Sequence, residues 1–472
     1  MKKVSLSIFL ASLVLGAYAQ DNVFPGNSDR GLITAGTYDE IILDSSSANR
    51  YKAKSVTTGK LTAVSGDSAG DVVIANSIDY DGKLGITVDI AKESGEHKVF
   101  SVASWEQNLF TLKFTNSVAN SSAVALIDFG STLTQNANAD PAKPTSSQSD
   151  YLVFENINAK VTATEAKIGA HATLAADYGA YSTFTIAKTA NVDWTGNMTF
   201  GYSAKVNLDG TFTLNGAYTD NSNAKLVHTG TFVYNNASKG ITFSSKIESS
   251  GRFEQTTNAD KGVTLQNDVV LNSGASWKVD GQLLLAENHS LTVNDGAKFE
   301  FVNNGRLIFR KNSTVILNAE NCLTLANGGF AKFTTYNNAN ECNVYVNADQ
   351  TIGNIYVNKT IMNLYLADDV SLTLTVVDNM AVNGVSTEDK PAEVRIFNYQ
   401  DESIQVLKTS DTIIAGIETF VKLYDAEGEF LGNATLVDGW ITLVEATVPE
   451  PAEWAMIFGA VALGFAMYRR RK

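Results

Sequence analysis

An internal repeat in the middle of the chain restricts the possible folds more than any other feature. Three similar units follow one another at spacings of 20 and 21 residues, at 210–215, 230–235 and 251–254, and each has glycine first and phenylalanine third. Further on, residues 274–279 resemble residues 296–301, which lie 22 positions later. Self-similarity at this period is typical of solenoid proteins, in which each unit buries its apolar side chains against its neighbours.

Two more matches extend the repeat and indicate its secondary structure. Residues 281–285 resemble 305–309, and a longer match pairs 286–304 with 319–338. Within the units apolar and polar residues alternate, as in Ser-Leu-Thr-Val at 290–293, and Gly, Asn and Asp separate the alternating runs. This pattern predicts short strands joined by tight turns. We therefore expect an all-β chain folded as a right-handed parallel β-helix, with one coil per roughly 20 to 24 residues.

The sequence divides into segments of different composition. We expect a signal peptide at 1–19, a β-rich N-terminal region at 20–136, a linker or loop at 137–150, β-helix repeats at 151–387, a β-hairpin capping region at 388–446 and a terminal hydrophobic segment at 449–472. The linker is predicted from Pro141 and Pro144 among Ala, Ser and Asn. The cap is predicted from turn residues at 425–428 and 438–439, each between alternating runs. Such a cap would cover the edge of the last coil.

The N-terminus has the three parts of a secretory signal. Lys2 and Lys3 give a positive start, 6–15 is a short apolar run, and Ala17 and Ala19 form a small-x-small cleavage site. Cleavage is expected after Ala19. The sequence therefore predicts an exported protein.

The C-terminus combines a short motif, an apolar run and a basic end. Pro449, Glu450 and Pro451 precede the apolar residues 454–468. As a helix this run is about 23 Å long, so it could cross a hydrocarbon core of about 30 Å only with its flanks included. The chain ends with four cations: Arg469, Arg470, Arg471 and Lys472. Under the positive-inside rule these stay cytoplasmic and leave the body of the protein outside.

This order of motif, hydrophobic helix and basic end resembles the PEP-CTERM sorting signal of Gram-negative bacteria. The resemblance covers residues 449–472 alone. It implies that an exosortase-type enzyme processes the chain near the motif, that the helix holds the chain in the inner membrane before processing, and that the mature protein reaches the cell surface or the extracellular space. It implies nothing about the activity of residues 20–448.

The charge balance argues against nucleic acid as a partner. The chain has 36 basic and 50 acidic residues and a net charge of −14. Without the two terminal segments, 30 basic and 48 acidic residues remain. Binding to phosphates requires clustered Lys and Arg, and in the sequence no cluster stands out before the C-terminal tail.

The two cysteines, Cys322 and Cys342, suggest a structural bond. They occupy similar places in two units 20 positions apart, and stacked coils lie about 4.8 Å apart, which suits a disulfide. Two separate buried thiols are the alternative. The histidines are scattered singly, so neither a metal site nor a cofactor is expected. They are His97, His171, His228 and His289.

No motif in the sequence predicts catalysis, and we expect no catalytic residue. Residues 66–70 have the Gly-x-Ser-x-Gly form of a hydrolase elbow, but a strand-like run follows instead of the required helix. Residues 128–130 read Asp-Phe-Gly without any other kinase signature. Three pairs of adjacent acids point to opposite faces of a strand or lie in turns, which does not suit paired-carboxylate hydrolysis. The pairs are Asp368-Asp369, Glu388-Asp389 and Asp401-Glu402.

Three tyrosines recur at spacings of 11 and 9 residues, at Tyr345, Tyr356 and Tyr365. They could form a face for sugars or pack against one another. We expect a secreted structural or adhesion protein of the cell surface or extracellular matrix, with exopolysaccharide or surface glycans as candidate partners. The alternative is a carbohydrate-binding or carbohydrate-active protein, a polysaccharide lyase or glycosidase, on the same scaffold.

Overall fold

The structure of the chain is a computed structural model, and its described regular elements are strands apart from one short turn of helix. The described residues are 88–101, 105–108, 111–135, 150–169, 182–236, 238–256, 262–302, 305–336, 340–368, 372–383, 392–407 and 416–444, and before residue 88 only strand segments are described. Within these residues the one helical element is the 3-10 turn η2 (Ile417–Thr419). The chain is therefore all-β over the part that the structure describes.

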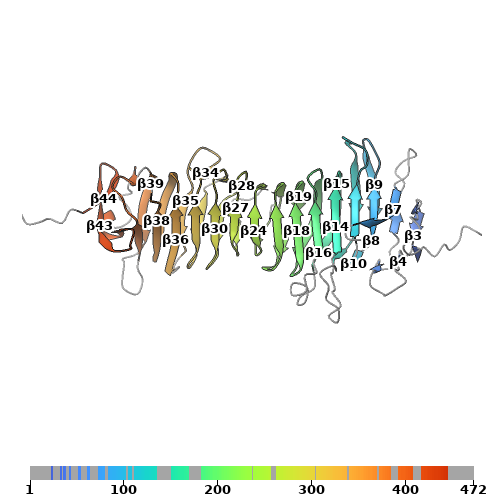
Figure 1. Cartoon of the computed structure of the whole chain (residues 1–472), viewed down its shortest axis with the longest axis horizontal. Helices are drawn as coiled ribbons and strands as arrows, with labels where there is room; N and C mark the ends of the chain where they lie inside the picture. The colour runs from blue at the N-terminus through green and yellow to red at the C-terminus, as the bar shows by residue number, and fades with distance from the viewer. Residues whose placement is uncertain are drawn as a thin grey trace, which may run out of the picture.

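Parallel sheets run along the molecule, with their strands side by side (Figure 1). The first sheet contains β8 (Lys83–Asp89), β11 (Thr111–Thr115), β14 (Asp150–Glu155), β16 (Ser182–Ile186), β18 (Ala204–Leu208), β21 (Lys225–His228), β24 (Lys246–Ser249), β27 (Val269–Leu271), β30 (Ser290–Val293), β33 (Thr314–Leu317), β36 (Asn340–Val346), β38 (Thr360–Leu366), β40 (Glu393–Phe397) and β42 (Val421–Tyr424). Each of these strands pairs in parallel with the next one in this order.

Two further sheets complete the coils, the second one in the N-terminal and middle coils and the third one in the middle and C-terminal coils. The second sheet contains β9 (Glu96–Ser101), β10 (Trp105–Asn108), β12 (Val124–Asp128), β13 (Thr132–Gln135), β15 (Asn158–Ile168), β17 (Asn191–Phe200), β19 (Thr211–Asn215), β20 (Tyr218–Asp220), β22 (Thr231–Tyr234), β25 (Arg252–Gln255), β28 (Ser276–Val279), β31 (Lys298–Phe301) and β34 (Leu323–Leu325). The third sheet contains β23 (Ile241–Phe243), β26 (Val263–Leu265), β29 (Gln282–Leu285), β32 (Arg306–Phe309), β35 (Lys332–Thr335), β37 (Gln350–Asn358), β39 (Leu374–Asn383) and β41 (Ile404–Val406). The chain visits the sheets in turn, which gives a solenoid-like arrangement.

The repeat unit is held by aromatic rings stacked inside the coils. Phe212, Phe232, Phe253, Trp277 and Phe299 occupy one register position on successive strands of the second sheet. Their neighbouring ring centroids are 5.5, 5.5, 5.0 and 6.3 Å apart. All five are buried, so the phenylalanine of the repeat forms part of one continuous core.

The glycine of the repeat serves the close approach of one coil to the next. A Cβ atom on Gly230 would lie 2.1 Å from the carbonyl oxygen of Gly210, and one on Gly251 would lie 2.4 Å from that of Gly230. In later coils the same corner has Gly274 and Gly296, which have φ angles of 88° and 74°. The register position of Gly251 is occupied by Ala275 and Ala297 in the next two coils. Glycine therefore serves the close contact in the earlier coils, and one residue before that position it serves the turn conformation in the later ones.

Asparagines connect these later corners. The Nδ2 atom of each donates to the Oδ1 atom of the asparagine one coil earlier, from Asn294 to Asn272, Asn318 to Asn294 and Asn347 to Asn318, at 3.1, 2.9 and 2.7 Å. Because each amide both donates and accepts, the asparagine turns of neighbouring coils are tied together.

The parallel stack is longer than the expected repeat region of 151–387. It begins no later than β8, because β8 pairs with β11 and β11 pairs with β14 across residues 137–150. The predicted linker, at 137–150, lies almost entirely outside the described residues. At the other end β40 and β42 still pair in parallel.

Antiparallel strands end the described chain. β42 pairs with β43 (Phe430–Val437), and β43 pairs with β44 (Trp440–Leu443), with turns at the two places that the sequence indicated. Asp438 and Gly439 in the second turn have φ angles of 49° and 88°. β44 also pairs with β41 through Trp440, so this hairpin lies against the end of the third sheet.

One of the sequence matches predicted the wrong pairing of strands between coils. The match of 286–304 with 319–338 equates β31, in the second sheet, with β35, in the third sheet. In the structure β31 pairs with β34, and β35 pairs with β32. Strands of different sheets have the same alternation of apolar and polar residues, so sequence similarity did not identify the sheet.

Candidate functional site

A row of aromatic side chains lies on the outer side of the first sheet near the C-terminal end. We call Tyr345, Tyr365, Phe397 and Tyr424 the aromatic ladder. Their ring centroids are 4.6, 4.7 and 4.7 Å apart, with interplanar angles of 12° to 20°. The rings share one register position on β36, β38, β40 and β42, which explains the even spacing.

The stacking limits what the aromatic ladder can bind. Each ring of the middle pair, Tyr365 and Phe397, has another ring against both of its faces. A sugar that stacks on an aromatic side chain needs a free face, so these two rings offer only their edges. Tyr356 lies on β37 in the third sheet and is not part of the ladder. The geometry therefore favours packing of these rings over a sugar platform.

A group of paired charges lies beside the aromatic ladder. The carboxylate of Glu393, whose side chain is 8% exposed, accepts from Lys422 Nζ at 2.6 Å and from Arg395 Nε at 3.0 Å. The Arg395 Nη1 atom also lies 3.8 Å from the Oε1 atom of Glu341. Burial alone would raise the pKa of Glu393, but the bonds from Lys422 and Arg395 together hold it below its usual range. These cations are balanced by carboxylates and serve to join coils.

Three lysines form a second outward row on the first sheet. Lys205, Lys225 and Lys246 occupy the same register position on β18, β21 and β24, and all three are exposed. We call them the lysine ladder. Neighbouring strands lie about 4.8 Å apart, so three cationic side chains leave the sheet at that interval.

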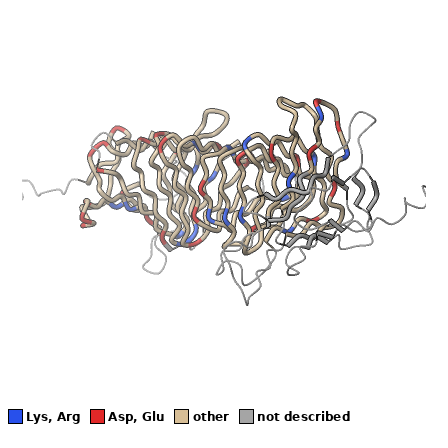
Figure 2. The backbone as a smooth tube through the Cα atoms, turned by 45° about the vertical axis from the view of Figure 1, so that its right-hand side comes forward, with Lys and Arg blue, Asp and Glu red and all other residues tan. Residues whose placement is uncertain are grey.

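Another outward column shows the opposite pattern. On the second sheet Glu254 pairs with Lys278, and Lys278 pairs with Glu300. The Lys278 Nζ atom lies 3.7 Å from the Glu300 carboxylate. Along the described coils Lys and Arg positions also lie among Asp and Glu positions (Figure 2), and on the third sheet Arg306 lies opposite Lys332. The lysine ladder thus concentrates positive charge on an acidic protein.

The lysine ladder was not predicted from the sequence. The three lysines lie 20 and 21 residues apart and look dispersed in the sequence. The signal was present, because these spacings equal those of the Gly-x-Phe units in the same region. A residue repeated at the period of a solenoid is placed in one row by the stacking.

Polar side chains inside the coils are inaccessible to substrates. His228 Nδ1 lies 3.0 Å from Ser249 Oγ, which also accepts from Trp277 Nε1 at 3.0 Å. Such a pair could suggest a nucleophile and a base, but all three residues are at most 2% exposed. Burial lowers the pKa of His228 to about 4, so the imidazole is neutral at pH 7. This group supports the core of the stack.

Asp220 is a second buried polar group and ties two coils together. Its carboxylate accepts from the backbone N–H groups of Ser244 and Ser245, at 2.6 and 3.0 Å, and from the Ser245 hydroxyl at 2.5 Å. The Tyr218 hydroxyl donates to it at 3.2 Å. Burial raises the pKa of Asp220, although these donors favour the charged form. Because its carboxylate accepts all of these hydrogen bonds inside the fold, Asp220 stabilises the stack.

The motifs weighed as catalytic have structural positions where they are described. Asp128 accepts from the N–H of Gly130 at 2.8 Å, and Phe129 is fully buried. Asp401 accepts from the Tyr399 hydroxyl at 2.9 Å in an exposed turn. The Gly-x-Ser-x-Gly segment at 66–70 lies outside the described residues, as do Asp369, Glu388 and Asp389.

The predicted disulfide between Cys322 and Cys342 is wrong. Both thiols are free and buried. Cys342 lies on β36 in the first sheet and pairs with Met362, whereas Cys322 precedes β34 in the second sheet. The physical reason is the same as for the mismatched repeat, since the two similar segments belong to different sheets. Burial raises the pKa of the Cys322 thiol to about 12 and that of Cys342 further.

The two processing signals lie outside the described residues. These are Lys2 to Ala19 at one end, and Pro449, Glu450, Pro451 and the terminal Arg469, Arg470, Arg471 and Lys472 at the other. Among the described residues no helix has the length and apolar character needed to cross a membrane. In the same part of the chain no group of three or more His, Cys, Asp or Glu side chains is arranged to hold a metal ion.

Comparison of the chain with known proteins finds no relative, so the class of protein is defined by its fold alone. A scan of protein-family models gives no match, and searches of curated proteins and of solved structures give no significant match. The class is thus an all-β, solenoid-like protein with stacked parallel strands.

Proposed function

We propose that this chain is an exported structural or adhesive protein of the bacterial cell surface, without catalytic activity, whose body is a right-handed parallel β-helix. In this proposal residues 1–19 direct export. Residues 449–472 hold the chain in the inner membrane until an exosortase-type enzyme processes it near Pro449. The mature protein then stays at the cell surface or in the extracellular matrix.

The continuous parallel register from β8 to β42 is the observation that carries this proposal. With about 4.8 Å per strand, this row extends over about 60 Å. Buried side chains fill the interior along its whole length, so the body is stiff and presents long outer faces. A stiff, elongated body whose described internal polar groups are inaccessible suits a scaffold or spacer better than an enzyme.

Processing can be tested in the bacterium that encodes the chain. Intact-mass measurement of surface material should give a protein that begins at Gln20 and lacks the residues after the Pro-Glu-Pro motif. A variant ending at Val448 should be exported and then released into the medium or periplasm. Recovery of the wild-type chain from the cytosol with Met1 in place would overturn the proposal.

The absence of catalysis is tested separately. Purified protein is incubated with a panel of neutral and acidic polysaccharides, and the release of reducing or unsaturated ends is measured. No turnover is expected above that of a heat-unfolded sample. Sustained turnover would favour the alternative of a polysaccharide lyase or glycosidase, even if the processing result stood.

A further inference from the structure

We infer that Asn327 is a site of spontaneous deamidation, a covalent modification that needs no enzyme. Asn327 and Gly328 are exposed and lie at the tip of a turn that follows β34 and projects from the stack (Figure 1). The product is aspartate or isoaspartate at this position, so each reacted chain gains one negative charge. The reaction needs neither export nor processing and is therefore independent of the proposed function.

A short antiparallel turn presents the two reacting residues to solvent. Leu325 N donates to the Gly329 oxygen at 3.0 Å, and Thr324 forms an antiparallel bridge with Phe330. Gly328 has a φ angle of 80°. Apart from its chain neighbours, no atom lies within 4 Å of the position that a Cβ atom of Gly328 would take. The backbone nitrogen of Gly328 therefore has no side chain beside it that would hinder its attack.

The side chain of Asn327 is held in the arrangement that the reaction needs. Its Oδ1 atom accepts from the Gly329 N–H at 3.2 Å. This bond closes a ring that includes the Gly328 nitrogen, so the Asn327 Cγ atom stays beside that nitrogen. The same N–H stabilises the negative charge that develops on Oδ1 when Cγ is attacked. The Gly328 N–H donates to the Leu325 oxygen at 3.0 Å, and this bond must open first.

The reaction has two steps, and hydroxide is regenerated in the first. Hydroxide removes the proton from the Gly328 nitrogen, which then forms a bond to Asn327 Cγ. The bond from Cγ to Nδ2 breaks, ammonia leaves with a proton taken from water, and a five-membered succinimide ring remains. Water then adds to one of the two ring carbonyl groups and breaks its bond to the ring nitrogen. Opening at Cγ gives aspartate, and opening at the main-chain carbon gives isoaspartate.

Among the described residues, only Asn327 combines this side-chain bond with a following glycine. Asn116, Asn221 and Asn236 accept in the same way from the N–H two positions later, at 3.1, 3.0 and 3.0 Å. Serine or alanine follows each of them, and a side chain there hinders attack by the nitrogen. Asn221 is exposed like Asn327, so the two sites differ chiefly in the residue that follows.

Asn215 has the opposite combination, because it precedes a glycine but is held by the stack. Its Nδ2 atom donates to Asp193, and its Oδ1 atom accepts from Asn235 Nδ2 at 2.9 Å. Gly216, which follows it, is packed against the Gly196 carbonyl group. Turning the Asn215 amide toward the Gly216 nitrogen would break both bonds. The fold therefore protects this second Asn-Gly pair.

The test incubates the purified full-length protein at neutral and at mildly alkaline pH and follows its peptides by mass spectrometry. The peptide with Asn327 should gain the mass difference between aspartate and asparagine, and it should do so faster at the higher pH because hydroxide starts the reaction. The peptides with Asn215 and Asn221 should lag far behind. No gain at Asn327, or an equal gain at Asn221, would overturn the inference.

Unfolding the chain in guanidinium chloride separates the effect of structure from that of sequence. In the unfolded chain Asn215 and Asn327 should react at similar rates, because both precede glycine and neither is held. In the folded protein Asn327 should react about tenfold faster than Asn215 or more, a difference of about 1.4 kcal/mol in the activation barrier. An equal ratio of the two rates in both states would contradict the role of the fold.

Two variants test the geometry of the site. Gly328→Ala should slow the reaction at Asn327 about tenfold or more, because its methyl group hinders attack by the nitrogen. Ser222→Gly should make Asn221 reactive, because it supplies the missing glycine next to the same side-chain bond. An unchanged rate in the first variant, or an unreactive Asn221 in the second, would overturn the inference.

Discussion

At the scale of single residues, His228 makes the stability of the stack depend on pH. Its imidazole is 2% exposed, and burial lowers its pKa to about 4, compared with about 6.5 in an unfolded chain. Between these values the unfolded chain binds a proton that the folded protein does not. Stability from this residue is therefore complete above pH 6.5 and decreases as the pH falls toward 4.

We predict that lowering the pH from 7.5 to 5 reduces the free energy of unfolding by about 2 kcal/mol through His228. The measurement is urea unfolding at both pH values for the wild type and His228→Gln, which should lack this part of the pH dependence. Asp220, whose pKa is raised, acts in the opposite direction in both proteins. The His97→Gln variant is the control. An unchanged pH dependence in His228→Gln would contradict the prediction.

Gly230 is a residue whose role comes from contact between coils. We predict that Gly230→Ala lowers the free energy of unfolding by about 1 to 3 kcal/mol, because its Cβ would lie 2.1 Å from the Gly210 oxygen and the coils would have to separate. Ser250→Ala, an exposed turn substitution, should change it by less than about 0.5 kcal/mol. Urea unfolding distinguishes the two. Similar small effects would show that the coils adjust easily at this corner.

At the scale of elements, the aromatic ladder connects successive strands of the first sheet. We predict a coupling free energy of about 0.5 to 1.5 kcal/mol between Tyr345→Ala and Tyr365→Ala in a double-mutant cycle, since the two rings stack at 4.6 Å. The control cycle pairs Tyr365→Ala with Tyr356→Ala, on another sheet, and should be additive within about 0.5 kcal/mol. Equal coupling in both cycles would show that direct stacking is not the cause.

Strands and turns could be predicted from the sequence, but their sheets could not. The alternation at 290–293 and the glycine at 251 indicated a strand and a corner because each pattern has a local physical cause. All faces of a coil use the same alternation, so Cys322 and Cys342 looked equivalent although they lie on different sheets. The sheet to which a strand belongs can be assigned only when the number of residues in each turn between strands is known.

The same limit applied to the candidate sites. The tyrosines were predicted as one row, but the structure assigns Tyr356 to the third sheet and extends the row with Phe397 and Tyr424. The lysine ladder was invisible to a search for clustered cations, because its members are 20 or 21 residues apart. Both rows follow from register, which depends on pairing between coils.

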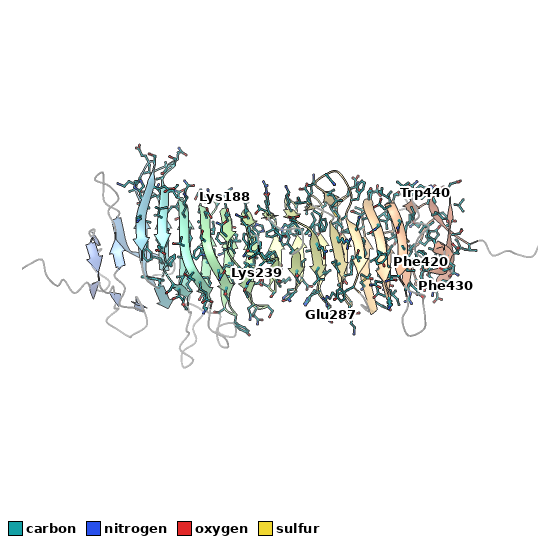
Figure 3. All side chains as sticks on the ribbon, turned by 180° about the vertical axis from the view of Figure 1, so that it is seen from behind. Lys188, Lys239, Glu287, Phe420, Phe430 and Trp440 are labelled. Carbon is teal, nitrogen blue, oxygen red and sulfur yellow. The ribbon has the colours of Figure 1, made fainter. Side chains whose placement is uncertain are left out.

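At the scale of the whole molecule, stability comes from neighbouring coils. Pairings between strands of the parallel sheets join one coil to the next, and no described pair of strands links distant coils. The hairpin of β43 and β44 covers the C-terminal end, where Phe430 and Trp440 lie (Figure 3). Unfolding of such a molecule can begin at one end and spread, so it need not follow a single cooperative step.

The asparagine rungs at 272, 294, 318 and 347 give this architecture a genetic consequence. Each asparagine side chain bonds only to the asparagines of the coils directly before and after it. A duplicated segment of one period would therefore be inserted between two existing coils and would make the same bonds to both. Duplication of one such segment in the gene would thus lengthen the stack along its axis by about 4.8 Å. At the coils that bear Lys205, Lys225 and Lys246, each added increment would also add one cation.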